Sequence, residues 1–222
     1  MGATGLPTWE GGLDDLAVTV IQAGVGPLRA ARAARDLDSS YDLLVSCGFA
    51  GALRPALAVG ALVIPERIVW AQGAYEVEPA LRACLRAALA RLPGAPSVAG
   101  ALLSSPSILA TAAAKAAAGR EHAAVAVEME AAALAERARA VDRPLVPLRV
   151  ILDPVDLSLE GLPPGLDTSW TARGRLLWTP TLWATALTLG RHAQVAETAL
   201  RRVVAPALRA FRDVRAGAGE GE

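Results

Sequence analysis

Apolar runs that end in glycine alternate along this chain with alanine-rich stretches of helical spacing. Residues 16–23, LAVTVIQA, form a β-branched run that ends at the turn GVGP, residues 24–27. The following residues place Ala and Arg at helical spacing, and residues 43–46 lead in a similar way into Gly48 and Gly51. This alternation predicts an α/β fold: a single-domain, three-layer α/β/α arrangement with a mixed, mostly parallel central sheet.

Further segments carry the periodicity of a strand or a helix. They are, in chain order, a strand pair at 60–70, a helix at 78–92, a strand at 97–105, a helix at 111–119, a strand at 122–130 that feeds a helix near residue 130, and a strand at 144–153. The last of these is apolar from Leu145 to Leu152 apart from Pro147 and Arg149, which suits a strand buried on both faces of a sheet.

We expect residues 1–215 to form one domain, because 222 residues of which 53% are hydrophobic can bury one sizeable core. The C-terminal part changes character, with a Pro/Gly loop at 161–170, an apolar stretch at 176–189 and a basic amphipathic helix at 191–212. Residues 216–222, AGAGEGE, are expected to be a frayed tail.

Charge and cysteine usage exclude several classes of function. Lys plus Arg and Asp plus Glu both number 22, so the net charge is zero and no electrostatic footprint for nucleic acid is present. Two cysteines, Cys47 and Cys84, and two histidines, His122 and His192, suggest neither a disulfide framework nor a metal site. No targeting segment is recognised, and residues 176–190 are too short and too rich in threonine to span a bilayer. We expect a cytoplasmic protein.

Two carboxylates stand in the apolar stretch AVAVEMEAAALAERA, residues 124–138, where Glu128 and Glu130 flank Met129. Burying an unpaired carboxylate costs several kcal/mol or forces it to take up a proton, so these side chains should face water or a ligand with hydroxyl groups. Ligands of such sheets bind beyond the carboxyl ends of the strands. Because Glu128, Glu130 and Asp153 all fall at such ends, they are candidate site residues.

Four stretches resemble one enzyme family. VEMEAAALA (127–135) is similar to the signature of the purine nucleoside phosphorylase and methylthioadenosine/adenosylhomocysteine nucleosidase superfamily. QAGVGP (22–27) resembles its first glycine turn, residues 46–69 resemble its glycine-rich strand end and the following strand pair, and LRVILD (148–153) resembles the strand that carries its catalytic aspartate. The four stretches fall in the order that the family requires.

The resemblance implies cleavage of the N-glycosidic bond of a purine nucleoside, through a transition state with positive charge on the sugar. Asp153 would start protonated and share its proton with purine N7. Glu130 would accept hydrogen bonds from the ribose 2′ and 3′ hydroxyls, each worth about 1.5–3 kcal/mol. Met129 would lie under the sugar, whereas Glu128 would either contact the substrate or pair with an arginine.

The same resemblance assigns the purine contacts. The backbone at Ala50 and Gly51 would approach the base, where small residues leave room, and Val127 would touch the face of the base.

The nucleophile is phosphate or water. Gly24 and Gly26 open a helix and would hold either one on free backbone N–H groups. Family members start with a strand whose following loop brings a carboxylate to the site; here that strand is cut short or Glu10 stands in for the carboxylate. Phe49 lies where relatives have a small polar residue, and a phenyl ring cannot donate to phosphate. The resemblance favours phosphorolysis, with inorganic phosphate as co-substrate and no cofactor.

Residues 153–164, DPVDLSLEGLPP, and the Trp-rich tail resemble the hopanoid-associated phosphorylase branch. This implies removal of adenine from adenosylhopane, and Trp170, Trp178 and Trp183 beside a basic helix would suit contact with a membrane surface. The same tryptophans would equally suit the core or a contact between copies of a homo-oligomer. The alternatives are a futalosine or methylthioadenosine nucleosidase that uses water, and a nucleoside-binding module without catalysis.

Overall fold

The computed structural model describes residues 5–37, 40–92, 97–161 and 183–219, and its centre is an eight-stranded sheet of order β6-β5-β8-β9-β3-β10-β4-β7. The pairs β10–β3, β4–β7, β5–β8 and β8–β9 are parallel and the other three are antiparallel, which confirms the predicted mixed sheet. The strands are β3 (Leu44–Ala52), β4 (Leu62–Val63), β5 (Arg67–Trp70), β6 (Gly73–Glu76), β7 (Ser97–Val98), β8 (Ala101–Ser104), β9 (Ala124–Glu128) and β10 (Leu145–Asp153).

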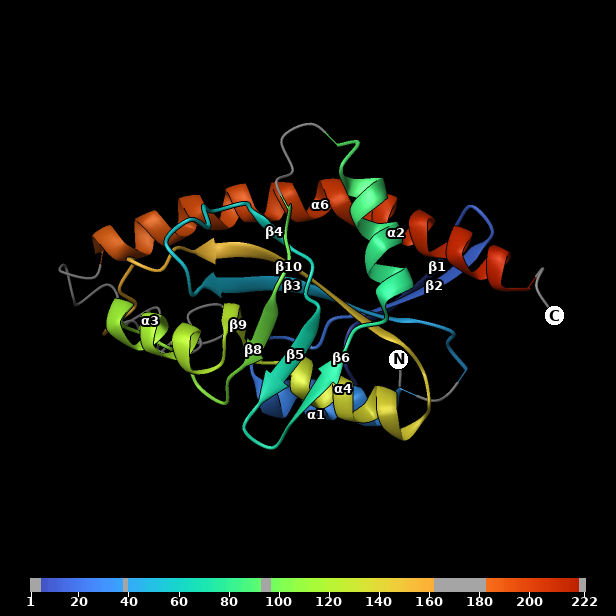
Figure 1. Ribbon diagram of the computed structural model, residues 1–222, viewed down its shortest axis with the longest axis horizontal. Helices are drawn as coiled ribbons and strands as arrows, with labels where there is room; N and C mark the ends of the chain where they lie inside the picture. Colours follow the sequence, from blue (N-terminus) through green and yellow to red (C-terminus); the bar gives the residue numbers. More distant parts are fainter. Residues whose placement is uncertain (1–4, 38–39, 93–96, 162–182, 220–222) are drawn as a thin grey trace.

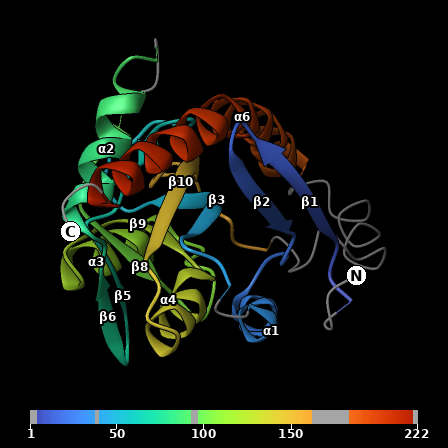
Figure 2. The same ribbon diagram turned by 90° about the vertical axis from the view of Figure 1, so that its right-hand side faces the viewer.

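Helices cover both faces of the sheet (Figures 1 and 2). On one face α2 packs against α6 and α6 packs against β10, and on the other face α1 packs against α4. This is the expected three-layer arrangement. The helices are α1 (Pro27–Asp36), α2 (Pro79–Leu89), α3 (Ala112–Glu121), α4 (Ala131–Ala140) and α6 (Trp183–Gly219).

The central strand β10 divides the core. Val146, Leu148 and Val150 belong to the cluster that packs against α2 and α6. Leu145 and Ile151, at alternate positions, belong to the cluster beneath α4. Both faces of the strand are therefore buried, as its apolar sequence predicts.

The first two strands form a sheet of their own. β1 (Thr8–Leu13) pairs only with β2 (Leu16–Ile21), in antiparallel register with Trp9 opposite Val20, and this hairpin stands apart from β3 (Figure 2). The sequence predicts β2 but neither β1 nor β6. TWEGGL and GAYE lack a period-two alternation of apolar residues, so only pairing with a neighbouring strand makes them extended.

Other boundaries also differ from the prediction. The strand expected at 97–105 is split at Gly100, whose φ of +142° breaks the extended backbone. The C-terminal segment forms one long helix, α6, and this helix continues to Gly219, into the expected frayed tail. Packing against β10 and α2 stabilises this helix despite Pro206. No described helix is long and apolar enough to cross a membrane. Trp170, Trp178 and the Trp183 side chain lie outside the described residues.

Candidate functional site

Glu128 ends β9, and its buried carboxylate is held from two directions. Its two oxygens accept hydrogen bonds from the N–H of Ala131, at 3.1 and 2.9 Å, and Oε2 also accepts from the N–H of Glu130 at 3.1 Å. These N–H groups lie at the start of α4, where a carboxylate interacts favourably with the helix dipole. On its other side Oε2 lies 2.8 Å from Nη2 of Arg149. Of the two roles that the sequence allows Glu128, the structure provides the arginine partner.

Arg149 lies on β10 and is 2% exposed. Its Nη2 donates to the Ser46 hydroxyl at 2.8 Å, and its Nη1 donates to the Ser46 backbone carbonyl. Its Nε is buried and has no hydrogen-bond partner among the described residues. A buried guanidinium is unfavourable unless it is paired, and here Arg149 is paired with Glu128 and bonded to Ser46. Through these contacts the side chain of Arg149 connects β3, β9 and β10. The sequence alone does not point to Arg149 or Ser46 as site residues; the available signal is the one charged residue in the apolar run 145–152.

Glu130 is the N-cap residue of α4 and reaches across to the first glycine turn. Its Oε1 accepts a hydrogen bond from the N–H of Gly26 at 2.7 Å, and its Oε2 accepts from the N–H of Met129 at 3.2 Å. Desolvation raises the pKa of this carboxyl, and the nearby charge of Glu128 raises it further. The hydrogen bonds from Gly26 and Met129 and the charge of Arg149 act in the opposite direction.

The turn before α1 needs glycine at two positions. Gly24 and Gly26 have φ values of +82° and +104°, which favour glycine. A Cβ on Gly24 would lie 2.9 Å from Nη1 of Arg29, so the Arg29 guanidinium covers this glycine. Arg29 is exposed, and no ion pair in the described part of the chain includes it. The turn therefore places backbone N–H groups and an available cation beside Glu130.

Asp153 ends β10 opposite Gly51 of β3, and its Oδ2 lies 2.6 Å from Nζ of Lys115. A Cβ on Gly51 would lie 2.9 Å from Oδ2 and 3.1 Å from Oδ1 of Asp153. The absence of a side chain at Gly51 therefore leaves room for the Asp153 carboxyl group, and the ammonium group of Lys115 lies beside that carboxyl group. The sequence alone does not point to Lys115 as a site residue, although it is the single lysine of the chain.

One open cleft of about 2120 Å³ gathers the predicted site residues. Apart from Gly26, which contacts Glu130, all of them line it: Glu10, Gly24, Phe49, Ala50, Gly51, Val127, Glu128, Met129, Glu130 and Asp153. Their surroundings differ.

Within the cleft, Ala50 and Val127 are buried, Met129 is partly buried, and Phe49 is 37% exposed. Glu10 is an exposed residue of the β1–β2 hairpin, where it lies opposite Thr19. It therefore lines the cleft from the side of the hairpin. The cleft is open, and its volume exceeds the 300–1,000 Å³ of an ordinary small-molecule site.

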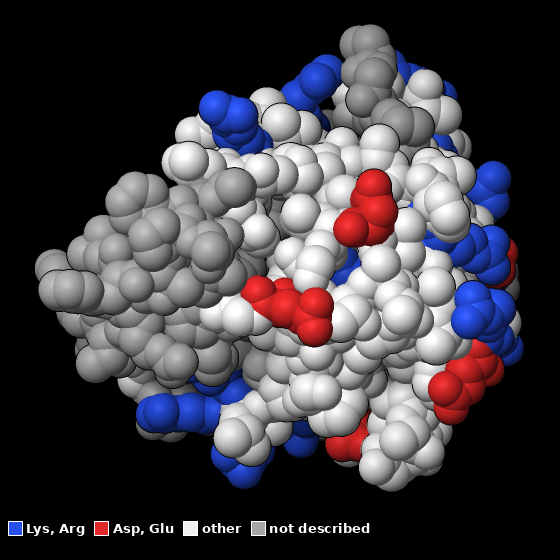
Figure 3. All heavy atoms as spheres, turned by 90° about the vertical axis from the view of Figure 1, so that its left-hand side faces the viewer, with Lys and Arg blue, Asp and Glu red and all other residues white. Residues whose placement is uncertain are grey.

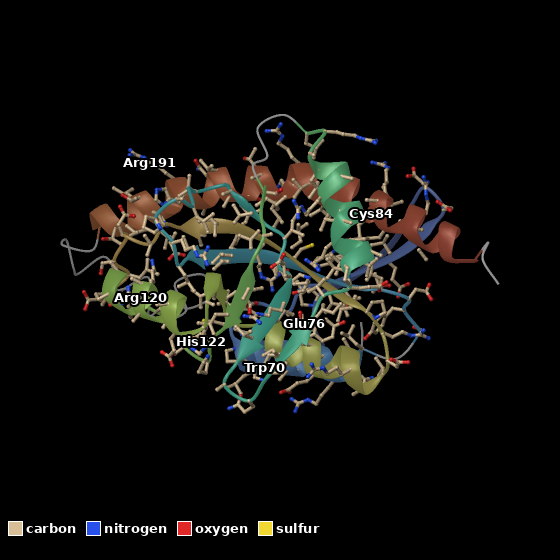
Figure 4. The ribbon with its side chains drawn as sticks, viewed as in Figure 1. Trp70, Glu76, Cys84, Arg120, His122 and Arg191 are labelled. Atoms are coloured by element: carbon tan, nitrogen blue, oxygen red, sulfur yellow. The ribbon has the colours of Figure 1, made fainter. Side chains whose placement is uncertain are left out.

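No group of three or more His, Cys, Asp or Glu side chains that could hold a metal ion occurs in the part of the chain that the structure describes. Cys84 on α2 and His122 at the end of α3 lie on different elements (Figure 4), and Cys47 and Cys84 form no disulfide. On the face at which β3 and β10 end, the described Lys and Arg side chains lie in separate groups, mainly toward the rim (Figure 3).

The family model of the phosphorylase superfamily matches residues 3–163, which include every element that carries a site residue. The chain belongs to this superfamily. It is therefore an enzyme of the nucleoside phosphorylase and nucleosidase class, whose members generally act without a cofactor. No curated protein matches this phosphorylase-superfamily chain.

Solved structures share the fold of this superfamily member. A 5′-methylthioadenosine/S-adenosylhomocysteine nucleosidase from Neisseria meningitidis has a TM-score of 0.73 and 19% identity, over 94% of this chain and 87% of that one. The corresponding nucleosidase from Colwellia psychrerythraea, solved with adenine, has a TM-score of 0.71 and 20% identity, over 91% and 82%. A futalosine hydrolase from Helicobacter pylori has a TM-score of 0.57 and 18% identity, over 67% and 80%. At these identities the likeness establishes the fold alone.

Proposed function

We propose that this enzyme cleaves the N-glycosidic bond of an adenine nucleoside. One observation carries the proposal: Glu130, at the start of α4, and Asp153, at the end of β10, line the same cleft, and each is held by specific contacts. A nucleoside needs an acceptor for its ribose diol and an acid for its base, and these two carboxyl groups supply both.

Glu130 is the proposed ribose ligand. Its Oε2 holds only the longer hydrogen bond, 3.2 Å from the N–H of Met129, so it can accept a sugar hydroxyl. Hydrogen bonds from the diol would stabilise the charged form of Glu130, whose pKa burial has raised. Met129, partly buried beside it, is the proposed apolar floor under the sugar.

Asp153 is the proposed acid for the base. As the C1′–N9 bond breaks, its electron pair moves into the purine, and a proton from Asp153 neutralises the base at N7. The protonated carboxyl faces N7, and after transfer the carboxylate can accept from the 6-amino group, so a 6-aminopurine fits this side chain better than a 6-oxopurine. Ala50 and Val127 are the proposed walls of the base site.

Phosphate is the proposed nucleophile. Arg29 lies against Gly24 at the start of α1, so a guanidinium, backbone N–H groups and a helix N-terminus meet beside Glu130. A phosphate oxygen would attack C1′ as the purine leaves, which gives a ribose 1-phosphate and free adenine. Glu10 is kept as a candidate carboxylate on the hairpin side of the cleft.

Hydrolysis is the second candidate, because Glu130 already accepts the Gly26 N–H that phosphate would use. A phosphate there would also meet the charge of Glu130, and Phe49 offers it no donor. Water is neutral, so neither the charge of Glu130 nor the missing donor at Phe49 disfavours it.

We also propose a bulky apolar 5′ substituent, with adenosylhopane as the candidate substrate. Ile108 is 53% exposed and lines the cleft together with Phe49, Leu109 and Leu189, which is more apolar surface than adenosine can cover. Peripheral contact with a membrane surface and self-association are part of the same proposal. Val25 and Leu28, at the start of α1, are exposed apolar side chains suited to a second copy of the chain.

The test is incubation with adenosine, methylthioadenosine, futalosine and a 5′-alkylated adenosine, with and without phosphate, followed by measurement of free base and sugar product. We expect free adenine, a ribose 1-phosphate and a rate that depends on phosphate. Free base with an unphosphorylated sugar at a phosphate-independent rate would establish hydrolysis. Release of no base from any adenosine derivative would refute the proposed cleavage.

A further inference from the structure

Lys115 is the single lysine among the 22 Lys and Arg residues of this chain, and its side chain is 1% exposed. It lies in α3 and borders the cleft beside Asp153. A fully buried cation is unusual unless its partners compensate for lost hydration. Where every other cation of the chain is an arginine, this position holds a lysine.

The contacts of Lys115 explain the choice of residue. An ammonium group has three N–H donors, and three acceptors surround Nζ: Oδ2 of Asp153 at 2.6 Å, the carbonyl of Pro154 at 3.0 Å and the carbonyl of Leu157 at 2.9 Å. A guanidinium is planar and presents its donors in a fork, so it cannot point three of them from one atom. The ammonium is therefore completely satisfied, and Oδ1 is left as the oxygen of Asp153 that is open to a ligand.

We propose that Lys115 is a positioning residue for proton transfer from Asp153 to the purine, an inference that rests on the proposed cleavage of an adenine nucleoside. With substrate bound, a proton taken up from solvent is on Oδ1, and Oδ2 accepts from Lys115. When the C1′–N9 bond breaks, its electron pair enters the purine, the Oδ1 proton moves to N7, and Asp153 is left as a carboxylate beside the ammonium. No proton leaves Lys115.

The ammonium helps because it attracts the carboxylate formed by the transfer more strongly than it attracts the carboxylic acid that precedes it. An interaction that strengthens as the reaction proceeds lowers the barrier, whereas one that is equal in both states only tightens binding. Lys115 should therefore act on kcat through Asp153, with little effect on KM.

A purely structural role predicts something different. Lys115 also holds the backbone after β10 through Pro154 and Leu157, so its loss could simply loosen this loop. Such loosening would change stability and substrate affinity whether or not Asp153 can carry a proton. The dependence on Asp153 therefore separates the two roles.

The first experiment compares Lys115→Met with Arg120→Met, which removes an exposed cation from the same helix (Figure 4), using the most reactive adenosine derivative. We expect Lys115→Met to lower kcat about 10²-fold, at the lower end of general-acid effects, with KM changed less than about threefold. Arg120→Met should retain parent kinetics. Asp153→Asn and the double variant Lys115→Met/Asp153→Asn should share one kcat, because the amide that replaces the carboxyl group has no proton to give.

Chemical rescue tests the need for an ammonium group. In Lys115→Ala, added propylammonium should restore kcat at least about tenfold, since it supplies the deleted chain with its three N–H donors. Two control compounds should not restore kcat. Tetramethylammonium has the charge but no N–H group, and 1-propanol has neither the charge nor three donors. Melting curves of all variants show whether each is folded.

The outcomes separate two hypotheses. A parent enzyme that releases adenine, with Lys115→Met equally fast or impaired only in KM, refutes the role of Lys115 and leaves the proposed function intact. A further large loss of kcat from Lys115→Met in the Asp153→Asn background assigns Lys115 to loop structure and also refutes the role. A folded parent that releases no base from any adenosine derivative refutes the proposed function, and the role of Lys115 with it.

Discussion

The buried ion pair between Arg149 and Glu128 should dominate the stability of the site. In Arg149→Met the carboxylate of Glu128 keeps its backbone N–H donors but loses its only ion-pair partner among the described residues. Both side chains are at most 2% exposed, so water cannot replace the guanidinium. Removing one partner of a buried pair costs about 3–5 kcal/mol.

This loss is a large fraction of the 5–15 kcal/mol that holds a typical domain folded. For a chain of this size it corresponds to a fall in Tm of roughly 6–20 °C. The assay is urea unfolding of four proteins: the parent, Arg149→Met, Glu128→Gln and Glu128→Gln/Arg149→Met. A glutamine at 128 can still accept from the N–H of Ala131, so the cap of α4 is retained.

The double variant tests the reasoning. It contains neither buried charge, so we expect it to be less destabilised than Arg149→Met alone. If the free energy of unfolding of Arg149→Met lies within about 1 kcal/mol of the parent value, the pair is solvated or mobile and the argument from burial is wrong. If the two single effects simply add in the double variant, the charges do not interact as the 2.8 Å contact implies.

Four further predictions concern the site. Gly51→Ala should lower kcat about 10²-fold, because its Cβ would lie 2.9 Å from Oδ2 of Asp153. Gly48→Ala, whose Cβ would have its nearest neighbour at 3.9 Å, should keep the parent kcat. Similar kcat values for the two variants would contradict this packing argument. Glu130→Gln should weaken the binding of ribosides by about 1.5–3 kcal/mol and change the binding of free adenine little. Calorimetry measures both binding free energies. Because burial raises the pKa of Glu130, parent affinity for ribosides should fall on acidification already above the usual range of a glutamate, and a pH-independent affinity would oppose this. Arg29→Ala should raise the KM for phosphate, and an unchanged phosphate dependence would exclude Arg29 from the nucleophile site.

The sequence by itself determines the elements that carry the site. Apolar runs of limited length, bounded by glycine and proline, predict β3, β9 and β10, and the acidic residues that end β9 and β10 follow directly from these boundaries. An apolar strand can be recognised from its own residues because burial on both faces leaves no polar period. The order of four short motifs identifies the superfamily in the same way, without knowledge of any contact.

Only the tertiary structure decides which partners meet at those strand ends. The Gly26 N–H lies against Glu130 across 104 residues of sequence, and Lys115 reaches Asp153 from a helix whose own pattern gives no indication of a site. A periodic pattern fixes which face of an element is buried, but the neighbour of that face depends on strand order, which no local pattern encodes. The charge state of the site depends on these long-range contacts, and for this reason the ammonium beside Asp153 could not be inferred from the chain alone.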